Sequence, residues 1–145
     1  MTKFKPLIDR LFWIISIPTI AILTAVTTII YISPAPLAVT IILLSDLFTV
    51  YFLISPLFGY VQLRESSLFI KYGFFTKREI PYDKIRDTVK ERKFISESML
   101  SLKNAFEHVN IKYNTFDVTT VSVKDNDAFI AELKVRLADS RANQA

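Results

Sequence analysis

Two long apolar segments, separated by only four residues, constrain this chain more than any other feature. Residues 11–32 and 37–58 are each 22 residues long, and Asp46 is the only charged side chain in either. The hydrocarbon core of a bilayer is about 30 Å thick, so about 20 helical residues cross it while bonding every backbone polar group internally. Two of the four linker residues are proline, which interrupts helices. The sequence therefore predicts a hairpin of two membrane-spanning helices.

Basic side chains flank the open end of this hairpin and are absent from its turn. Three precede the first span and two follow the second: Lys3, Lys5, Arg10, Arg64 and Lys71. Cytoplasmic segments next to membrane spans carry an excess of such residues, so we expect both chain ends in the cytoplasm. A secretory signal peptide is the alternative for residues 11–32, but the run exceeds a normal apolar core and no small-residue cleavage motif ends it.

The chain after the hairpin changes from helical to strand periodicity. We expect residues 1–58 to form the N-terminal segment and hairpin, 59–138 one cytoplasmic domain, and 139–145 a tail. Apolar residues alternate with polar ones in short segments bounded by turn residues. The predicted strands are residues 60–63, 68–72, 77–80, a weaker segment through Ile85 and Val89, and then 109–113 and 116–123.

A helix is predicted at the C-terminal end of this domain. Phe129, Leu133 and Leu137 share one face at helical spacing, with Ile130 beside them, and Asp125 or Asn126 is suited to cap its start. A small antiparallel sheet leaves one end of its core open, so we expect this helix to pack across it.

Several of these segments resemble a bacterial PH-like domain family, the one that includes the sublancin immunity protein. The resemblance covers residues 60–137 and rests on the segments 80–85, 100–101, 109–113, 121–125 and 129–133. It implies an α-helical transmembrane hairpin followed by a PH-like α+β domain, in which antiparallel sheets are closed by a C-terminal helix. It also implies a bacterial cell-membrane protein without inherited catalytic residues, with bacteriocin self-immunity as the best-known activity of the family.

The residues themselves also indicate a binding protein rather than an enzyme. The chain has no cysteine, which excludes disulfides, thiol catalysis and cysteine-ligated zinc. Its one histidine, His108, precedes an inward-facing Val109, so we expect His108 on the exposed face of its strand. Two glycines are too few for a phosphate-binding loop, and no metal or cofactor is expected. A net charge of only +4 without a recognition motif disfavours nucleic acid as a partner.

Asp46 is the first candidate binding residue. An ionisable side chain in the middle of a span costs about 2.5 to 3.5 kcal/mol on insertion scales, which makes it a functional hypothesis by default. Folding the hairpin about its turn places Asp46 level with position 23, so Thr24 is the expected hydrogen-bond partner, with Thr27 second. The alternative is a structural role, in which the carboxyl group only fixes helix packing.

Two further candidates lie in the domain. If residues 84–93 are extended, alternation places four cations on one face, opposite Ile85 and Val89: Lys84, Arg86, Lys90 and Arg92. Such a stripe fits an anionic membrane surface or an acidic partner, or is an ordinary solvated face. The second candidate is an aromatic and basic turn, suited to a lipid interface or a partner protein unless its aromatic rings enter the core: Phe74, Phe75, Lys77 and Arg78. Phosphoinositide binding is disfavoured, because the first hairpin loop at 64–67 has no basic cluster.

Two functions from different classes follow. In the first, the protein protects its cell against a membrane-active bacteriocin by binding the peptide or shielding its target. In the second, it is an adaptor or accessory subunit of a larger integral membrane protein complex. In both functions the protein lies in the lipid bilayer, and neither function determines its oligomeric state. A transporter is disfavoured, because two spans cannot enclose a pathway without oligomerising.

Overall fold

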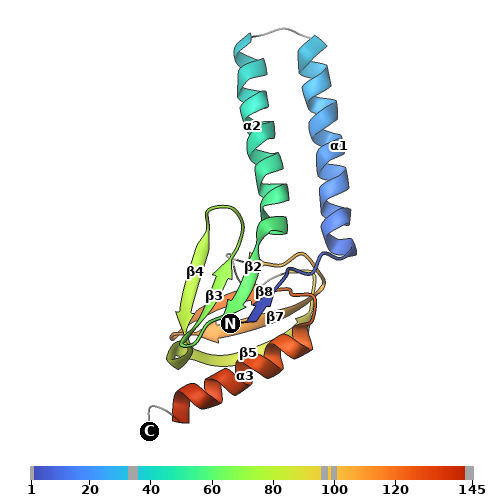
Figure 1. Ribbon diagram of the computed structural model, residues 1–145. Helices are drawn as coiled ribbons and strands as arrows, with labels where there is room; N and C mark the ends of the chain where they lie inside the picture. Colours follow the sequence, from blue (N-terminus) through green and yellow to red (C-terminus); the bar gives the residue numbers. More distant parts are fainter. Residues whose placement is uncertain (1, 33–35, 96–97, 99–100, 143–145) are drawn as a thin grey trace.

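The computed structural model describes residues 2–32, 36–95, 98 and 101–142, and it divides into a helical hairpin and a β-sandwich (Figure 1). The hairpin consists of α1 (Arg10–Ile32) and α2 (Pro36–Ile54), and a short 3₁₀ helix η1 (Ser55–Phe58) continues α2 into the sandwich. Residues 33–35 of the predicted turn lie outside the described residues. Both helices are long and apolar enough to cross a membrane, and almost none of their surface is buried within the protein. They project from the sandwich as two neighbouring rods.

The sandwich contains two four-stranded sheets. The first has the order β1-β2-β3-β4, with β1 at Thr2–Phe4, β2 at Tyr60–Leu63, β3 at Ser67–Lys71 and β4 at Lys77–Pro81. The second has the order β5-β7-β8-β6, with β5 at Ile85–Arg92, β6 at Ser101–Leu102, β7 at Glu107–Tyr113 and β8 at Asp117–Val121. A 3₁₀ turn, η2 (Tyr82–Lys84), connects the two sheets. All strand pairs are antiparallel except β6 with β8.

The hairpin is inserted between two neighbouring strands of the first sheet. β1 precedes α1 and pairs with β2, which follows η1, so that Lys3 lies opposite Gln62 and Phe4 opposite Val61. The next residues then run beside the end of β8, where the Leu7 N–H donates to the Ser122 carbonyl at 2.9 Å. The sandwich therefore holds both the segment that enters the hairpin and the segment that leaves it.

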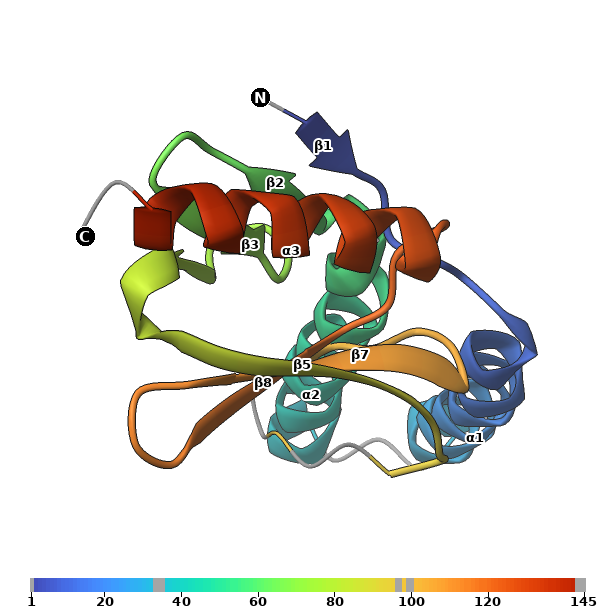
Figure 2. The ribbon, with the colours of Figure 1, turned by 90° about the horizontal axis from the view of Figure 1, so that it is seen from below.

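The C-terminal helix closes the core as predicted. α3 (Asn126–Ala142) lies across the sandwich in Figure 2 and buries Phe129, Leu133 and Leu137 against residues of both sheets. Asp125 is the N-terminal cap, because its carboxylate accepts the Ala128 N–H at 2.9 Å. Phe129 also meets Phe4 of β1 edge to face, with ring centroids 5.3 Å apart. The N-terminal strand and the C-terminal helix thus stabilise each other.

The predicted strands are all present, with ends shifted by one or two residues. The weak segment around Ile85 and Val89 is the eight-residue strand β5. The sequence did not predict β1 or the two-residue β6. Both are too short to show alternation, and each pairs with a strand that is distant in the sequence.

Candidate functional site

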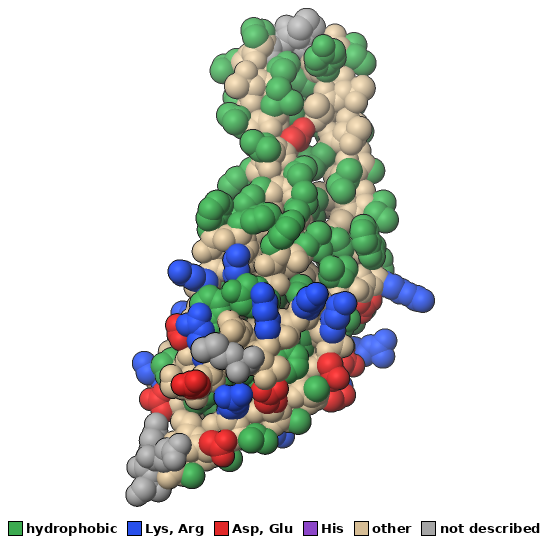
Figure 3. All heavy atoms as spheres, viewed as in Figure 1, with side chains coloured by type: hydrophobic (Ala, Val, Ile, Leu, Met, Phe, Trp, Pro, Cys, Tyr) green, Lys and Arg blue, Asp and Glu red, His purple; other side chains and the backbone are tan. Residues whose placement is uncertain are grey.

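A groove runs along the hairpin on the half that is farther from the sandwich. Its volume is about 450 Å³, and the surface of its walls is mostly apolar. Four polar residues also line it: Thr24, Thr27, Thr28 and Asp46. Figure 3 shows one acidic side chain amid the apolar hairpin, and Asp46 is the only acidic residue of α1 and α2. The groove therefore combines an apolar surface with one carboxyl group midway along the apolar hairpin.

The hydroxyl of Thr27 donates a hydrogen bond to Oδ2 of Asp46. Thr24, the preferred partner in the sequence analysis, instead donates to the Ile20 carbonyl of its own helix at 2.9 Å, so that preference is wrong. Helical side chains point toward the N-terminus of their helix. In an antiparallel pair, the Asp46 side chain therefore reaches toward the turn and the Thr27 side chain reaches away from it. The two side chains meet although the Cα of Thr27 lies one helical turn closer to the turn than position 23, the level estimated for Asp46. Thr24 still lines the same groove.

The turn between β3 and β4 packs its aromatic residues against the base of α2. Phe74 contacts Phe58 and Tyr51, with ring centroids 4.5 and 5.7 Å apart, and Phe75 stacks on Tyr51 at 6.0 Å. The turn approaches closely because Gly73 has no side chain: a Cβ there would lie 1.8 Å from the Ser55 hydroxyl oxygen. Phe74 and Phe75 remain 40% and 82% exposed, so neither belongs to the core.

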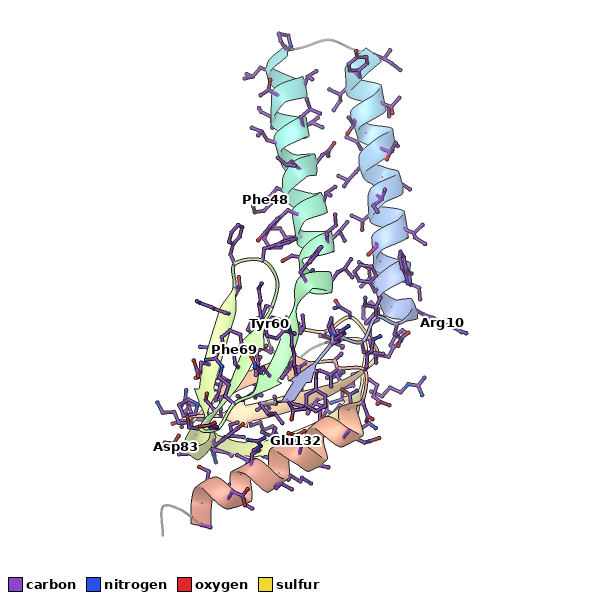
Figure 4. The ribbon with its side chains drawn as sticks, in the orientation of Figure 1. Arg10, Phe48, Tyr60, Phe69, Asp83 and Glu132 are labelled. Atoms are coloured by element: carbon purple, nitrogen blue, oxygen red, sulfur yellow. The ribbon has the colours of Figure 1, made fainter. Side chains whose placement is uncertain are left out.

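Two exposed cations, Lys77 and Arg78, follow this turn on β4. The Arg78 guanidinium lies over the ring of Tyr113, 5.3 Å from its centroid. In Figure 3, Lys and Arg side chains gather where the apolar hairpin meets the sandwich. Arg10, labelled in Figure 4, points outward from the foot of α1 at this level.

The predicted basic stripe does not form one face. Lys84 lies in η2, before the strand begins. A β-bulge between Ile85 and Asp87 then reverses the alternation, so that Val89 pairs with Asn110 and no longer shares a face with the core residue Ile85. The prediction that four cations project together, opposite Ile85 and Val89, is therefore wrong.

The cations of β5 consequently have separate surroundings. Arg86 lies at the bulge and donates to the Thr115 carbonyl at 3.0 Å. Lys90 binds Asp127 at 2.8 Å and Glu107 at 3.1 Å, and hydrogen bonds to these two carboxylates raise the pKa of Lys90. Arg92 is exposed at the end of the strand. Lys90 thus connects β5 to the first turn of α3.

His108 is buried rather than exposed, which corrects the sequence analysis. Its exposed fraction is 0%, and its Nδ1 lies 2.9 Å from the Phe106 carbonyl oxygen. Alternation failed because both faces of β7 are covered, so that His108 and Asn110 are buried along with Val109. Burial lowers the pKa of His108, which favours the neutral ring. Within the described residues, no group of three or more His, Cys, Asp or Glu side chains is placed to hold a metal ion.

Comparison with known proteins gives one family assignment. The family model described as the bacterial PH domain matches residues 59–137, from the start of β2 through most of α3. No curated protein and no solved structure matches the chain significantly. The match extends over more than half of the chain and agrees with the observed sandwich and terminal helix, whereas β1 and the hairpin lie outside it. The chain therefore belongs to the bacterial PH domain family.

Proposed function

We propose that this chain is a non-catalytic binding protein of the bacterial cell membrane that confers immunity to a membrane-active bacteriocin. Its hairpin crosses the bilayer with both chain ends in the cytoplasm, and the groove at Asp46 binds the peptide or the membrane segment that the peptide attacks. The groove is the observation that carries this proposal, since it is formed by the two apolar helices and has Asp46 in its lining.

The carboxyl group supplies the chemical argument. A carboxyl group is expensive to place in hydrocarbon, so it is retained where a partner satisfies it. Among the described residues, Thr27 is the hydrogen-bond partner of Asp46, and it occupies one of the two carboxyl oxygens. The other oxygen is available to a hydrogen-bond donor on a membrane-inserted helix, while Ile20, Leu23 and Val50 supply apolar contact. A peptide that presents a polar side chain to an apolar groove fits this arrangement.

Two features support the proposed placement of the hairpin in the membrane. Basic side chains collect at the foot of the hairpin, where they face the cytoplasmic leaflet in the proposed topology. Trp13, near the start of α1, and Tyr51, near the end of α2, both lie at the sandwich end of the hairpin, and such aromatic residues favour the membrane–water interface.

The test is a survival assay with the full chain in a sensitive Gram-positive host. Cells are challenged with a panel of membrane-active bacteriocins, and we expect protection against one peptide class. Asp46→Leu removes the hydrogen-bonding group and should abolish that protection, and Asp46→Asn should reduce it. Asp139→Asn, an exposed change on α3, is the matched control and should protect fully. Full protection by Asp46→Leu at equal membrane abundance would contradict a binding role for the carboxyl group.

An adaptor of a larger membrane complex is the second candidate. Phe116 is 92% exposed at the tip of the β7–β8 hairpin. A large aromatic side chain in that position is suited to contact a protein partner. Absence of protection across the panel, together with co-purification of an integral membrane protein that Phe116→Ala removes, would favour this function.

A further inference from the structure

A second cavity lies where the hairpin joins the sandwich, away from the groove at Asp46. Its volume is about 170 Å³. Residues from the first turns of α1, the end of α2, η1 and the β6–β7 loop line it, among them Phe12, Ser16, Phe52, Lys103 and Asn104. Most of the lining is apolar, and the polar residues come from α1 and from the β6–β7 loop.

Two buried polar groups in this lining have no hydrogen-bond partner among the described residues. They are the hydroxyl of Ser16 and the side-chain amide nitrogen of Asn104, whose residues are 4% and 5% exposed. Buried donors are nearly always satisfied by protein, water or ligand. Elsewhere in the hairpin, threonine hydroxyls bond the carbonyl four residues earlier, as Thr19 does with Ile15. Ser16 makes no such bond, so its hydroxyl remains available to a bound group.

Lys103 gives the cavity a positive charge. Its ammonium group donates to the Lys93 and Phe94 carbonyls at 2.7 Å each, which leaves one of its three N–H groups available. Burial lowers the pKa of Lys103, and a bound anion would oppose that shift. Two acidic residues lie nearby: the Asp9 carboxylate accepts the Phe106 N–H at 3.3 Å, and the charge of Glu91 partly offsets the lowering of the Lys103 pKa. Among the residues that the structure describes, Lys103 is the ionisable side chain that lines the cavity.

The depth of the cavity identifies its ligand. Ser16 lies five residues inside the apolar segment that begins at Leu11, or about 7 to 8 Å along the helix axis. The headgroup region of one leaflet is about 5 to 7 Å thick. Ser16 therefore lies on the acyl side of the ester level, in the outer part of the hydrocarbon, and Lys103 lies on the domain side, toward the phosphate level. At about 30 Å³ per water molecule, its volume equals five or six waters, enough for a phosphate group but not for a whole lipid.

We propose that this cavity binds the phosphate and ester oxygens of an anionic glycerophospholipid. Lys103 pairs with the phosphate, Ser16 and Asn104 donate hydrogen bonds to oxygens, and the acyl chains leave along the apolar surface of Phe12 and Phe52. The site rests on the membrane-spanning part of the proposed function and is separate from the groove at Asp46. Because its variants leave that groove unchanged, failure of the lipid site and failure of immunity are distinguishable.

The experiment measures lipid retention by the full chain. The protein is purified in detergent, exposed to equal amounts of phosphatidylglycerol and phosphatidylcholine, and analysed by native mass spectrometry. We expect the wild type to retain phosphatidylglycerol preferentially, and Lys103→Gln to lower that preference about tenfold or more, as for loss of a charged hydrogen bond. Ser16→Ala, which removes a hydroxyl with little change in volume, should lower retention and keep the preference. Lys134→Gln, an equal charge change on exposed α3, should match the wild type.

A thermal-shift series separates the lipid from a free phosphate. Short-chain phosphatidylglycerol should raise the Tm of the wild type more than short-chain phosphatidylcholine, glycerol 3-phosphate or inorganic phosphate. An equal shift with glycerol 3-phosphate would assign the site to a soluble phosphate and overturn the lipid assignment. Equal retention of both lipids by the wild type, or an unchanged preference in a folded Lys103→Gln protein, would overturn the proposal.

Discussion

The contact between Phe4 and Phe129 predicts that residues before the hairpin stabilise the sandwich that follows it. Truncating a fully buried phenylalanine to alanine costs about 3 to 5 kcal/mol. Phe4 is only partly buried against the core, so we expect about half of that loss, near 2 kcal/mol. The edge-to-face ring contact at 5.3 Å accounts for about 0.5 to 1.5 kcal/mol of this loss of stability. Phe4→Ala should therefore destabilise a sandwich whose other strands all follow the hairpin in the sequence.

Hydrogen exchange by mass spectrometry measures this loss in the full chain in detergent. A change of 2 kcal/mol corresponds to about 25-fold to 30-fold faster exchange wherever amides exchange through unfolding of the sandwich. The central strand β7 is the segment to follow. Phe116→Ala is the matched control, because Phe116 is 92% exposed and its truncation should change exchange little.

A double-mutant cycle tests the contact itself. Combining Phe4→Ala with Phe129→Leu should cost less than the sum of the two single changes, by about 0.5 to 1.5 kcal/mol. Exchange in β7 that responds to Phe4→Ala no more than to Phe116→Ala would refute the reasoning, and so would strict additivity in the cycle.

Two further predictions concern the sandwich. Hydrogen bonds from Asn126 and Lys90 lower the pKa of Glu107. The stabilising contribution of Glu107 is therefore complete above the unfolded pKa of about 4.5 and is lost as pH falls through the folded value. Thermal melts between pH 3 and 7 should show a Tm that declines on acidification, and the decline should be smaller in Glu107→Gln. Gly73→Ala would place a Cβ 1.8 Å from the Ser55 hydroxyl oxygen, so the β3–β4 turn should leave η1 and become easier to cleave by protease; an unchanged cleavage pattern would contradict that close approach.

Periodicity predicted the regular parts of this molecule because burial on one side imposes a repeat. The two apolar runs became α1 and α2, and the 3.6-residue spacing of Phe129, Leu133 and Leu137 became the buried face of α3. The resemblance to PH-like domains supplied the arrangement of these elements, and the family match agrees with it. Neither source revealed β1, because a three-residue edge strand has no repeat and its partner lies beyond the hairpin.

The candidate sites were predictable in residue type but not in geometry. Asp46 stood out because a charge interrupts an apolar run, yet its partner depended on the direction of helical side chains rather than on Cα level. One bulge after Ile85 invalidated the predicted face of β5, and coverage of both faces of β7 placed His108 in the interior. The cavity at Ser16 and Asn104 joins segments almost 90 residues apart, so no local pattern could indicate it.

The proposal that the groove at Asp46 binds a membrane-embedded segment is tested most directly by photocrosslinking in cells. p-Benzoylphenylalanine is placed either at position 28, which lines the groove, or at position 29, which is 66% exposed and outside the groove lining. After exposure to the bacteriocin against which the protein protects, irradiation should give a peptide or protein adduct from position 28 and none from position 29. Equal adducts from both positions, or lipid adducts alone from position 28, would contradict a binding function of the groove.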